Sequence, residues 1–193
     1  MQIELAVGIA VVLAIVGNVG YLLSVWKKEI NPHPVTWFVG SIVSAVTFFG
    51  AYVKGGGIGV IPILAAEIFT ILIFLLALRL SFQNGFNNVR KIDLVFLAIC
   101  IIGIIPWYLT NDPTISVMVV VAIDVISFIP TILKTKSNPA SENSLLFICN
   151  VFRHLLILFS LENMNIATSL HSFAMIAVNT LMIYYIFRFK KSL

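Results

Sequence analysis

Long apolar stretches, separated by short polar segments, run through the whole chain. A stretch of about 20 mostly apolar residues is long enough to cross the hydrocarbon core of a membrane as a helix. By that length the pattern predicts seven spans. They are Ile3–Trp26, Pro34–Val53, Ile58–Leu80, Ile92–Leu109, Thr114–Leu133, Asn143–Leu161 and Asn165–Phe187. We therefore expect an all-α, polytopic membrane protein with seven transmembrane helices.

The amino-acid composition supports the same interpretation. Of the 193 residues, 60% are hydrophobic and 10% are charged, whereas soluble domains are about 45–50% apolar and about 25% charged. These values, with a mean hydropathy of +1.07, exclude a secreted disulfide scaffold, a nucleic-acid-binding domain and a disordered chain. A net charge of +4 is then expected to lie in cytoplasmic loops. The expected partner is the lipid bilayer, not a nucleic acid.

Lysine and arginine residues occur in alternate connections between the predicted spans. One side carries most of them, and the other side carries Lys54 alone. The crowded side contains Lys27, Lys28, Arg79, Arg90, Lys91, Lys134, Lys136, Arg188, Lys190 and Lys191. Because basic loops stay in the cytoplasm, we expect the N-terminus outside and the C-terminus inside. Short loops and the absence of an N-x-S/T acceptor favour a multi-pass protein of a bacterial inner membrane.

An internal repeat relates the first predicted span to the fifth. The string Tyr21–Pro32 matches the string Phe128–Pro139 at a constant offset, with Lys27 on Lys134. The match predicts two three-helix units of the same orientation, separated by one linker helix, in a 3+1+3 arrangement. Parallel repeats of this kind are a transporter architecture with a site near the membrane midplane. The predicted units are residues 1–81 and 113–193, and residues 82–112 hold the linker helix and its flanking loops.

This layout resembles the PQ-loop superfamily, which includes the SWEET sugar carriers, the lysosomal cystine carrier and the KDEL receptor. Members place a Pro-Gln pair near the cytoplasmic end of the first helix of each triplet. Here the second triplet has Pro130-Thr131 followed by Asn138-Pro139 and Ser141-Glu142, and the first has Leu23-Ser24 at the aligned place. The same strings look like small bacterial membrane proteins. The resemblance implies a carrier with alternating access.

Three ionisable residues, Glu67, Asp124 and Arg153, lie about ten residues from the ends of their predicted spans. Such groups cost roughly 2.5–3.5 kcal/mol to insert and usually serve a function. Polar residues at helical spacing share their faces. The predicted solute-binding residues are Asn18, Trp37, Ser41, Ser44, Glu67, Asp124, Ser127, Asn150, Arg153, His154, His171 and Asn179. SWEET carriers have a pocket-facing Asn on the third helix of each triplet, which implies this role for Asn179 and, by position, for Glu67.

Several of these residues have structural alternatives that the sequence leaves open. Ser41 and Ser44 also suit close packing of membrane helices. Asn18 also suits a hydrogen bond between helices, and Trp37 also suits an anchor at the membrane surface. His171 could form part of a gate or only fill space between helices. Arg153 and an acidic residue could form a purely structural ion pair. Two prolines, Pro62 and Pro130, are expected to kink their spans and to act as hinges.

The intramembrane charges also predict proton coupling. Arg153 keeps its proton and needs a carboxylate partner in a medium of low dielectric constant. We expect Asp124 to be that partner. Glu67 is then left to exchange a proton near neutral pH, as intramembrane acids do in proton relays. Glu67 and Asp124 are therefore the predicted coupling residues, while passive transport stays open.

No enzyme motif is present: H-E-x-x-H, G-x-S-x-G and the phosphate-binding Walker loop are all missing. Scattered His and Cys residues give no metal spacing, so we expect neither a metal nor a cofactor. The sequence predicts a non-enzymatic membrane carrier for a small polar solute. The acidic, amide and basic side chains favour a zwitterion or an anion. The alternative is a receptor or accessory subunit that binds without transport, and the choice between monomer and homo-oligomer stays open.

Overall fold

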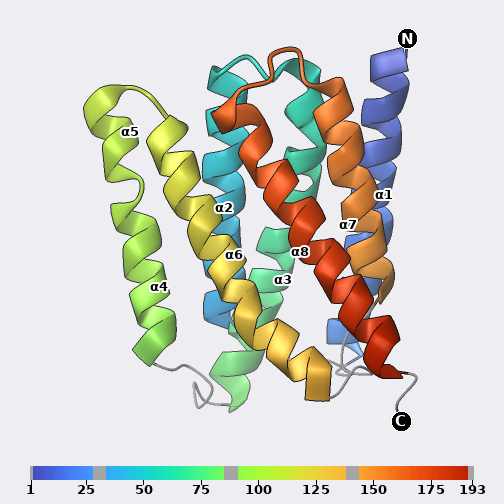
Figure 1. Cartoon of the computed structure of the whole chain (residues 1–193). Helices are drawn as coiled ribbons and strands as arrows, with labels where there is room; N and C mark the ends of the chain where they lie inside the picture. Colours follow the sequence, from blue (N-terminus) through green and yellow to red (C-terminus); the bar gives the residue numbers. More distant parts are fainter. Residues whose placement is uncertain (1, 28–33, 85–90, 138–143, 191–193) are drawn as a thin grey trace.

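The computed structural model describes residues 2–27, 34–84, 91–137 and 144–190. Every regular element in these ranges is a helix, which confirms the all-helical prediction. The elements are α1 (Gln2–Trp26), α2 (Pro34–Val53), the 3₁₀ helix η1 (Gly57–Val60), α3 (Ile61–Asn84), α4 (Lys91–Ile102), α5 (Ile105–Thr110), α6 (Thr114–Ser137), α7 (Ser144–Ser160) and α8 (Ile166–Lys190). The long helices run side by side, and the two termini lie at opposite ends of the bundle (Figure 1).

Three helical segments in the described ranges are long and apolar enough to cross a membrane. They are Gln2–Trp26, Gly57–Gln83 and Ile166–Phe189. Shorter apolar helices cover Trp37–Val53, Thr114–Phe128 and Ser144–Ser160. Many large apolar side chains on the helices point outward, among them Leu5 and Phe159. A bundle that exposes such residues is consistent with a membrane protein.

The fourth predicted span, Ile92–Leu109, is two helices rather than one. α4 ends at Ile102 and α5 begins at Ile105. Pro106 lies in the first turn of α5, and its ring cannot follow an unbroken helix without meeting the carbonyl group four residues earlier, that of Ile102. The backbone N–H of Trp107 donates to the backbone oxygen of Ile104 and also to the Ser116 hydroxyl, each at 3.1 Å, and the second contact ties α5 to α6.

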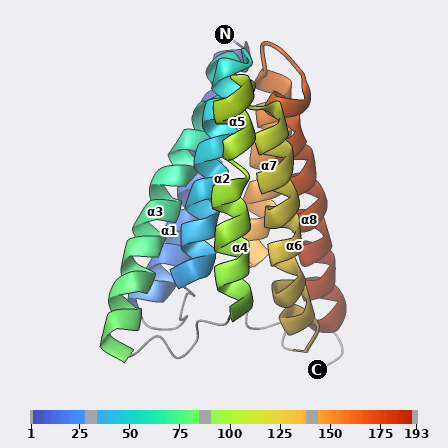
Figure 2. The ribbon, with the colours of Figure 1, turned by 90° about the vertical axis from the view of Figure 1, so that its left-hand side faces the viewer.

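The helices pack in two similar groups. α3 contacts both α1 and α2, and α8 contacts both α6 and α7. In the described part of the chain, no contact of comparable extent joins α1 to α2 or α6 to α7. The groups meet through α1 with α7 and through α2 with α6. α4 and α5 lie outside both groups, against α2 and α6 (Figure 2).

Small and β-branched residues hold the two groups together. Gly17 of α1 lies so close to α7 that an added Cβ would be 3.2 Å from the Cβ of Cys149. On the other side, valines of α2 and α6 form one buried cluster. It contains Val39, Val43 and Val46 of α2 and Val117, Val120 and Val121 of α6. Small residues at such contacts let membrane helices approach closely.

Of the two prolines predicted as hinges, the structure describes the side chain of Pro62 but not that of Pro130. Pro62 is the second residue of α3, directly after η1. A proline in a first turn removes no helical hydrogen bond, so Pro62 marks the change from 3₁₀ to α-helix and does not kink a continuous helix as predicted. Pro130 lies within α6, but its side chain is outside the described residues, as is the motif at Asn138-Pro139 and Ser141-Glu142.

Candidate functional site

The predicted site residues lie inside the bundle. Six are buried, namely Asn18, Glu67, Arg153, His154, His171 and Asn179. The others are half-buried, namely Trp37, Ser41, Ser44, Asp124, Ser127 and Asn150. Buried polar groups need partners in a medium without water. The partners therefore decide which of these residues act together.

Arg153 and His154 form a hydrogen-bonded pair that continues to α8. Arg153 donates from Nη2 to the Nε2 atom of His154 at 3.0 Å. A guanidinium group has no acceptor, so Nε2 must accept and the imidazole must carry its proton on Nδ1. That Nδ1–H then donates to the Ser172 hydroxyl at 3.1 Å. Arg153 thus fixes the tautomer of His154, and the hydroxyl of Ser172 accepts its Nδ1–H.

Among the described residues Arg153 has no acidic partner, contrary to the prediction that Asp124 pairs with it. Its second contact is a long one, from Nη1 to the backbone oxygen of Pro62 at 3.5 Å. Asp124 instead lies with one carboxylate oxygen 3.7 Å from Nε2 of His171. The reason is topological: α8 lies between α6 and α7, so His171 of α8 stands where Asp124 of α6 would have to reach Arg153 of α7.

The two histidines connect these contacts. The rings of His154 and His171 meet edge to face, with centroids 5.3 Å apart. Polar contacts therefore run from Pro62 of α3 through Arg153 and His154 to His171 and finally to Asp124. They cross three helix interfaces within the bundle.

Glu67 lies in the other group of helices. The Ser44 side chain lies next to its carboxyl group, at the contact between α3 and α2. The Glu67 oxygen Oε2 is buried and has no hydrogen-bond partner in the described part of the chain. Ser44 therefore makes a polar contact beyond its own helix. Ser41, in contrast, donates to the backbone oxygen of Trp37 within α2 at 3.0 Å.

The amide residues form a third set of contacts. Asn150 donates to the side-chain oxygen of Asn179 at 3.3 Å, which joins α7 to α8, and Asn179 donates to the backbone of Met175. The side chains of Asn18 and Ser127 bond to the backbone of their own helices, at Ala14 and Asp124. These last two contacts hold side chains in place without linking helices.

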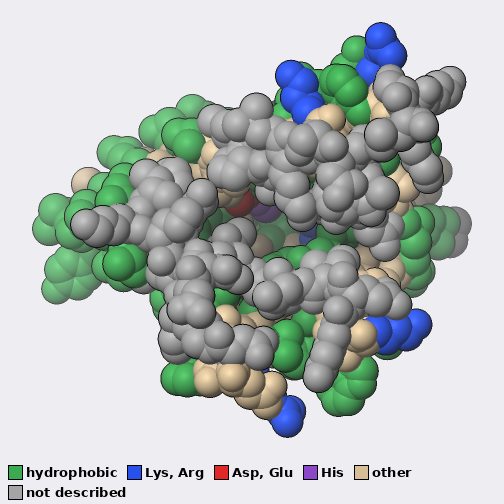
Figure 3. Space-filling model, turned by 90° about the horizontal axis from the view of Figure 1, so that it is seen from below, with side chains coloured by type: hydrophobic (Ala, Val, Ile, Leu, Met, Phe, Trp, Pro, Cys, Tyr) green, Lys and Arg blue, Asp and Glu red, His purple; other side chains and the backbone are tan. Residues whose placement is uncertain are grey.

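The end of the bundle opposite the N-terminus is hollowed. Figure 3 shows this end, with lysine and arginine side chains near its edge. Acidic and histidine side chains are visible at the bottom of a central hollow. Tyr21 near the end of α1 and Trp37 near the start of α2 lie toward this end of the bundle, with ring centroids 5.0 Å apart. The polar interior is thus visible from one end of the molecule.

The N-terminal end is tied together around Lys54. The ammonium group of Lys54 lies 2.8 Å from Oδ2 of Asp112, and its backbone oxygen accepts from the side chain of Asn165 at 3.1 Å. The next carbonyl, of Gly55, accepts from the Asn163 side chain at 3.2 Å. We call these contacts of Lys54, Gly55, Asp112, Asn163 and Asn165 the Lys54 clamp. It joins the connection after α2 to those after α5 and α7.

Charge and backbone shape both stabilise the Lys54 clamp. Hydrogen bonds from Lys54 and then from Thr114 hold the pKa of Asp112 well below its usual range. Gly55 and Gly57 have positive φ angles of 80° and 61°, a conformation that costs other residues about 1–2 kcal/mol. A Cβ on Gly57 would also overlap the Glu162 side chain. Glycine is therefore needed where the two connections meet.

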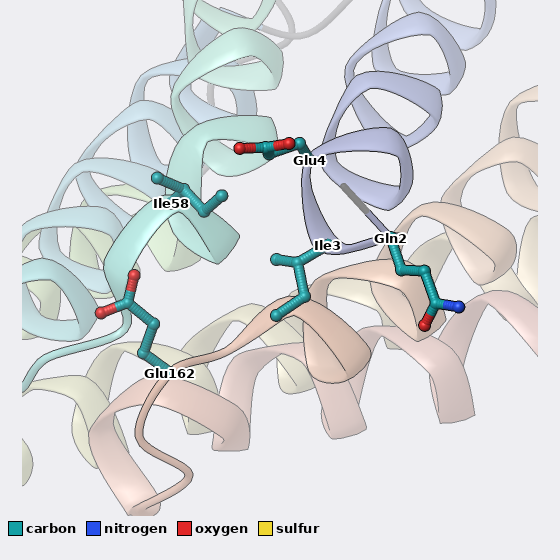
Figure 4. A pocket seen from close by; sticks show the side chains of 5 residues that line it. All are labelled: Gln2, Ile3, Glu4, Ile58 and Glu162. Carbon is teal, nitrogen blue, oxygen red and sulfur yellow. The ribbon is translucent and has the colours of Figure 1, made fainter.

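A cavity of about 450 Å³ lies at the same end, beside the Lys54 clamp. Gln2, Ile3 and Glu4 of α1 line it, together with Ile58 of η1 and Glu162 (Figure 4). None of the predicted site residues lines this cavity. It is a surface feature of this end and is separate from the polar interior.

Sequence reasoning missed Ser172 and the Lys54 clamp. Ser172 follows His171 and is one helical turn from Thr168, a polar face that spacing could have revealed. The clamp uses backbone carbonyl groups, which have no residue-type signature. In the described ranges, no group of three or more His, Cys, Asp or Glu side chains could hold a metal ion. Comparisons with models of known families, with curated proteins and with solved structures find no match.

Proposed function

We propose that this chain is a membrane carrier for a small polar solute. The two three-helix units move against each other, so that the solute site is open to one side of the membrane at a time. In this proposal α1–α3 form the first unit, α6–α8 form the second, and α4 with α5 forms the fourth of seven spans. In this proposal the N-terminus lies outside and the C-terminus in the cytoplasm of a bacterium, and the layout resembles that of the PQ-loop superfamily and of small bacterial membrane proteins.

The repeated packing of the helices is the observation that carries the proposal. In each group the third helix lies between the first and the second. Between the groups, the first helix of each contacts the second helix of the other, as α1 with α7 and α6 with α2. Two equivalent units related by a rotation about an axis along the membrane normal would make these reciprocal contacts. Parallel repeats of this kind place a solute between the halves.

The contrast between the two ends supports a state that is open to the cytoplasm. The Lys54 clamp joins the connections of both units at one end, while the hollow exposes acidic and histidine side chains at the other. For alternating access the clamp must separate when the solute reaches the outside. A receptor, in contrast, would keep one stable opening and leave the clamp intact.

Counterflow into proteoliposomes tests the carrier proposal. Purified protein is reconstituted with a panel of unlabelled sugars, amino acids or vitamins inside, and entry of the labelled solute is followed. We expect transient accumulation of at least one solute above its equilibrium level. A solute that binds with micromolar affinity but gives no counterflow in either orientation would establish the receptor alternative. Reporter fusions at residues 85–90 test the orientation, because a signal outside the cell at that loop contradicts it.

A further inference from the structure

In the part of the chain that the structure describes, three charged or ionisable side chains of the polar interior each keep one buried atom without a hydrogen-bond partner. The atoms are Oε2 of Glu67, Nε of Arg153 and Nδ1 of His171. Each side chain is only 7% exposed. Such atoms are rare in native proteins and point to a missing partner. They come from α3, α7 and α8, so both helix groups contribute.

The partners that Arg153 and Glu67 do have are neutral. Arg153 contacts a backbone oxygen and the neutral imidazole of His154, and Glu67 contacts the hydroxyl of Ser44. No opposite charge lies within 4.0 Å of either side chain in the described part of the chain. A buried charge without a counter-charge is strongly unfavourable. The interior therefore offers one basic and one acidic group, and a charged group of a solute can pair with each of them.

We propose that the solute is a small zwitterion, whose carboxylate binds Arg153 and whose ammonium group binds Glu67. The proposal rests on the proposed function, because it names the solute of the same site. A neutral sugar would leave both charges unpaired, and an anion would leave Glu67 unpaired beside a second negative charge. Only a solute with both charges balances Arg153 and Glu67 together. Asp124 lies apart from this pair, with a carboxylate oxygen 3.7 Å from Nε2 of His171.

His154 and Ser172 have a positioning role in this site. Because Nε2 of His154 accepts from Arg153, the guanidinium plane is held and the remaining N–H groups are directed elsewhere. A fixed guanidinium group suits a carboxylate, which it can bind through two parallel hydrogen bonds. Ser172 accepts the Nδ1–H of the same imidazole and so holds the ring in place. The positive group is thus oriented before the solute arrives.

Equilibrium binding to the full chain in lipid nanodiscs tests the proposal with a defined panel. The panel contains the labelled common α-amino acids and glycine betaine, glucose as a neutral probe, and the N-acetyl and amide forms of the tightest amino acid. We expect at least one zwitterion to bind. We expect both blocked forms to bind at least about tenfold more weakly, because each leaves one buried charge unpaired. Tighter binding by glucose or by a blocked form, or no binding at all, overturns the proposal.

Variants separate charge recognition from general damage. Glu67→Gln is expected to weaken the zwitterion at least about tenfold and to reverse the preference toward the N-acetyl form, a reversal that misfolding cannot produce. Ser160→Ala is the matched control, because the Ser160 hydroxyl is also buried and unpartnered but carries no charge. It should leave binding unchanged. Glu67→Gln that keeps the wild-type preference overturns the role of Glu67.

The outcomes also distinguish this inference from the carrier proposal. A zwitterion that binds but shows no counterflow removes the carrier function and leaves the recognition intact. Counterflow of a sugar without zwitterion binding supports the carrier and removes the recognition. The two proposals can therefore fail independently.

Discussion

Arg153 and His154 are adjacent in sequence, yet they bond to each other and face different helices. Arg153 reaches Pro62 of α3, while His154 reaches Ser172 of α8, and Nη2 of the first lies 3.0 Å from Nε2 of the second. Consecutive helical residues point about 100° apart, so both can be buried only where α7 lies between two neighbours. The pair therefore sits at the boundary between the two helix groups.

The tautomer of His154 gives a first prediction. Ser172→Ala should lower the free energy of unfolding by about 1–3 kcal/mol, because the buried Nδ1–H of His154 loses its acceptor. Thermal unfolding of the purified protein in detergent measures the change. Ser169→Ala is the control, since Ser169 is buried on the same helix but donates to the backbone of Asn165. Equal losses in the two variants would contradict the assignment.

The ion pair of the Lys54 clamp gives a prediction about pH. The pKa of Asp112 is lowered in the folded protein, so its stabilising effect is complete above the unfolded value of about 3.9. That effect is lost as the pH falls from there toward the folded value. The melting temperature of Asp112→Asn should therefore be below that of the wild type at pH 7. The difference should shrink steadily below about pH 4.

Lys54→Met provides the control for this dependence. Without the ammonium group, the largest cause of the lowered pKa of Asp112 is removed. In that background the further change Asp112→Asn should have a smaller effect at pH 7, and the effect should vary less with pH. If the double variant shows the full pH-dependent difference of the wild-type background, then Lys54 is not the partner that matters.

Alanine substitutions at two glycines are expected to change the stability of the protein in opposite directions. Gly57→Ala should destabilise the protein by at least about 1 kcal/mol, because its φ angle is 61° and its Cβ would meet Glu162. Among the described residues, an added Cβ on Gly8 of α1 would have no neighbour within 4 Å beyond its chain neighbours and the backbone of its own helix. Gly8→Ala should therefore stabilise by about 0.5–1 kcal/mol through helix propensity. Thermal unfolding compares them, and a stabilising Gly57→Ala would show that the connection has another conformation.

The sequence predicted the features that depend on local pattern. Helical character and burial of Glu67, Arg153 and His171 follow from the lengths of apolar stretches and from the positions of charges within them. The partner of Arg153 could not be predicted, because it depends on α8 lying between α6 and α7. Pro106 marks the break in the sequence, but the need for about 20 residues to span a membrane led to the prediction of one continuous helix. The proton-coupling roles of Glu67 and Asp124 stay predictions.

The Lys54 clamp must open if the chain is a carrier, and a cross-link can test that requirement. Ile58 of η1 and Glu162 of the α7–α8 connection line one cavity at the clamped end (Figure 4). Ile58→Cys with Glu162→Cys, joined by a short bifunctional thiol reagent, should hold the two connections together. Counterflow should then stop, while binding from the cytoplasmic side continues. The pair Glu162→Cys and Met164→Cys lies within one connection and should leave counterflow unchanged after the same treatment. Full exchange by the cross-linked Ile58 and Glu162 variant would show that these connections stay together throughout transport.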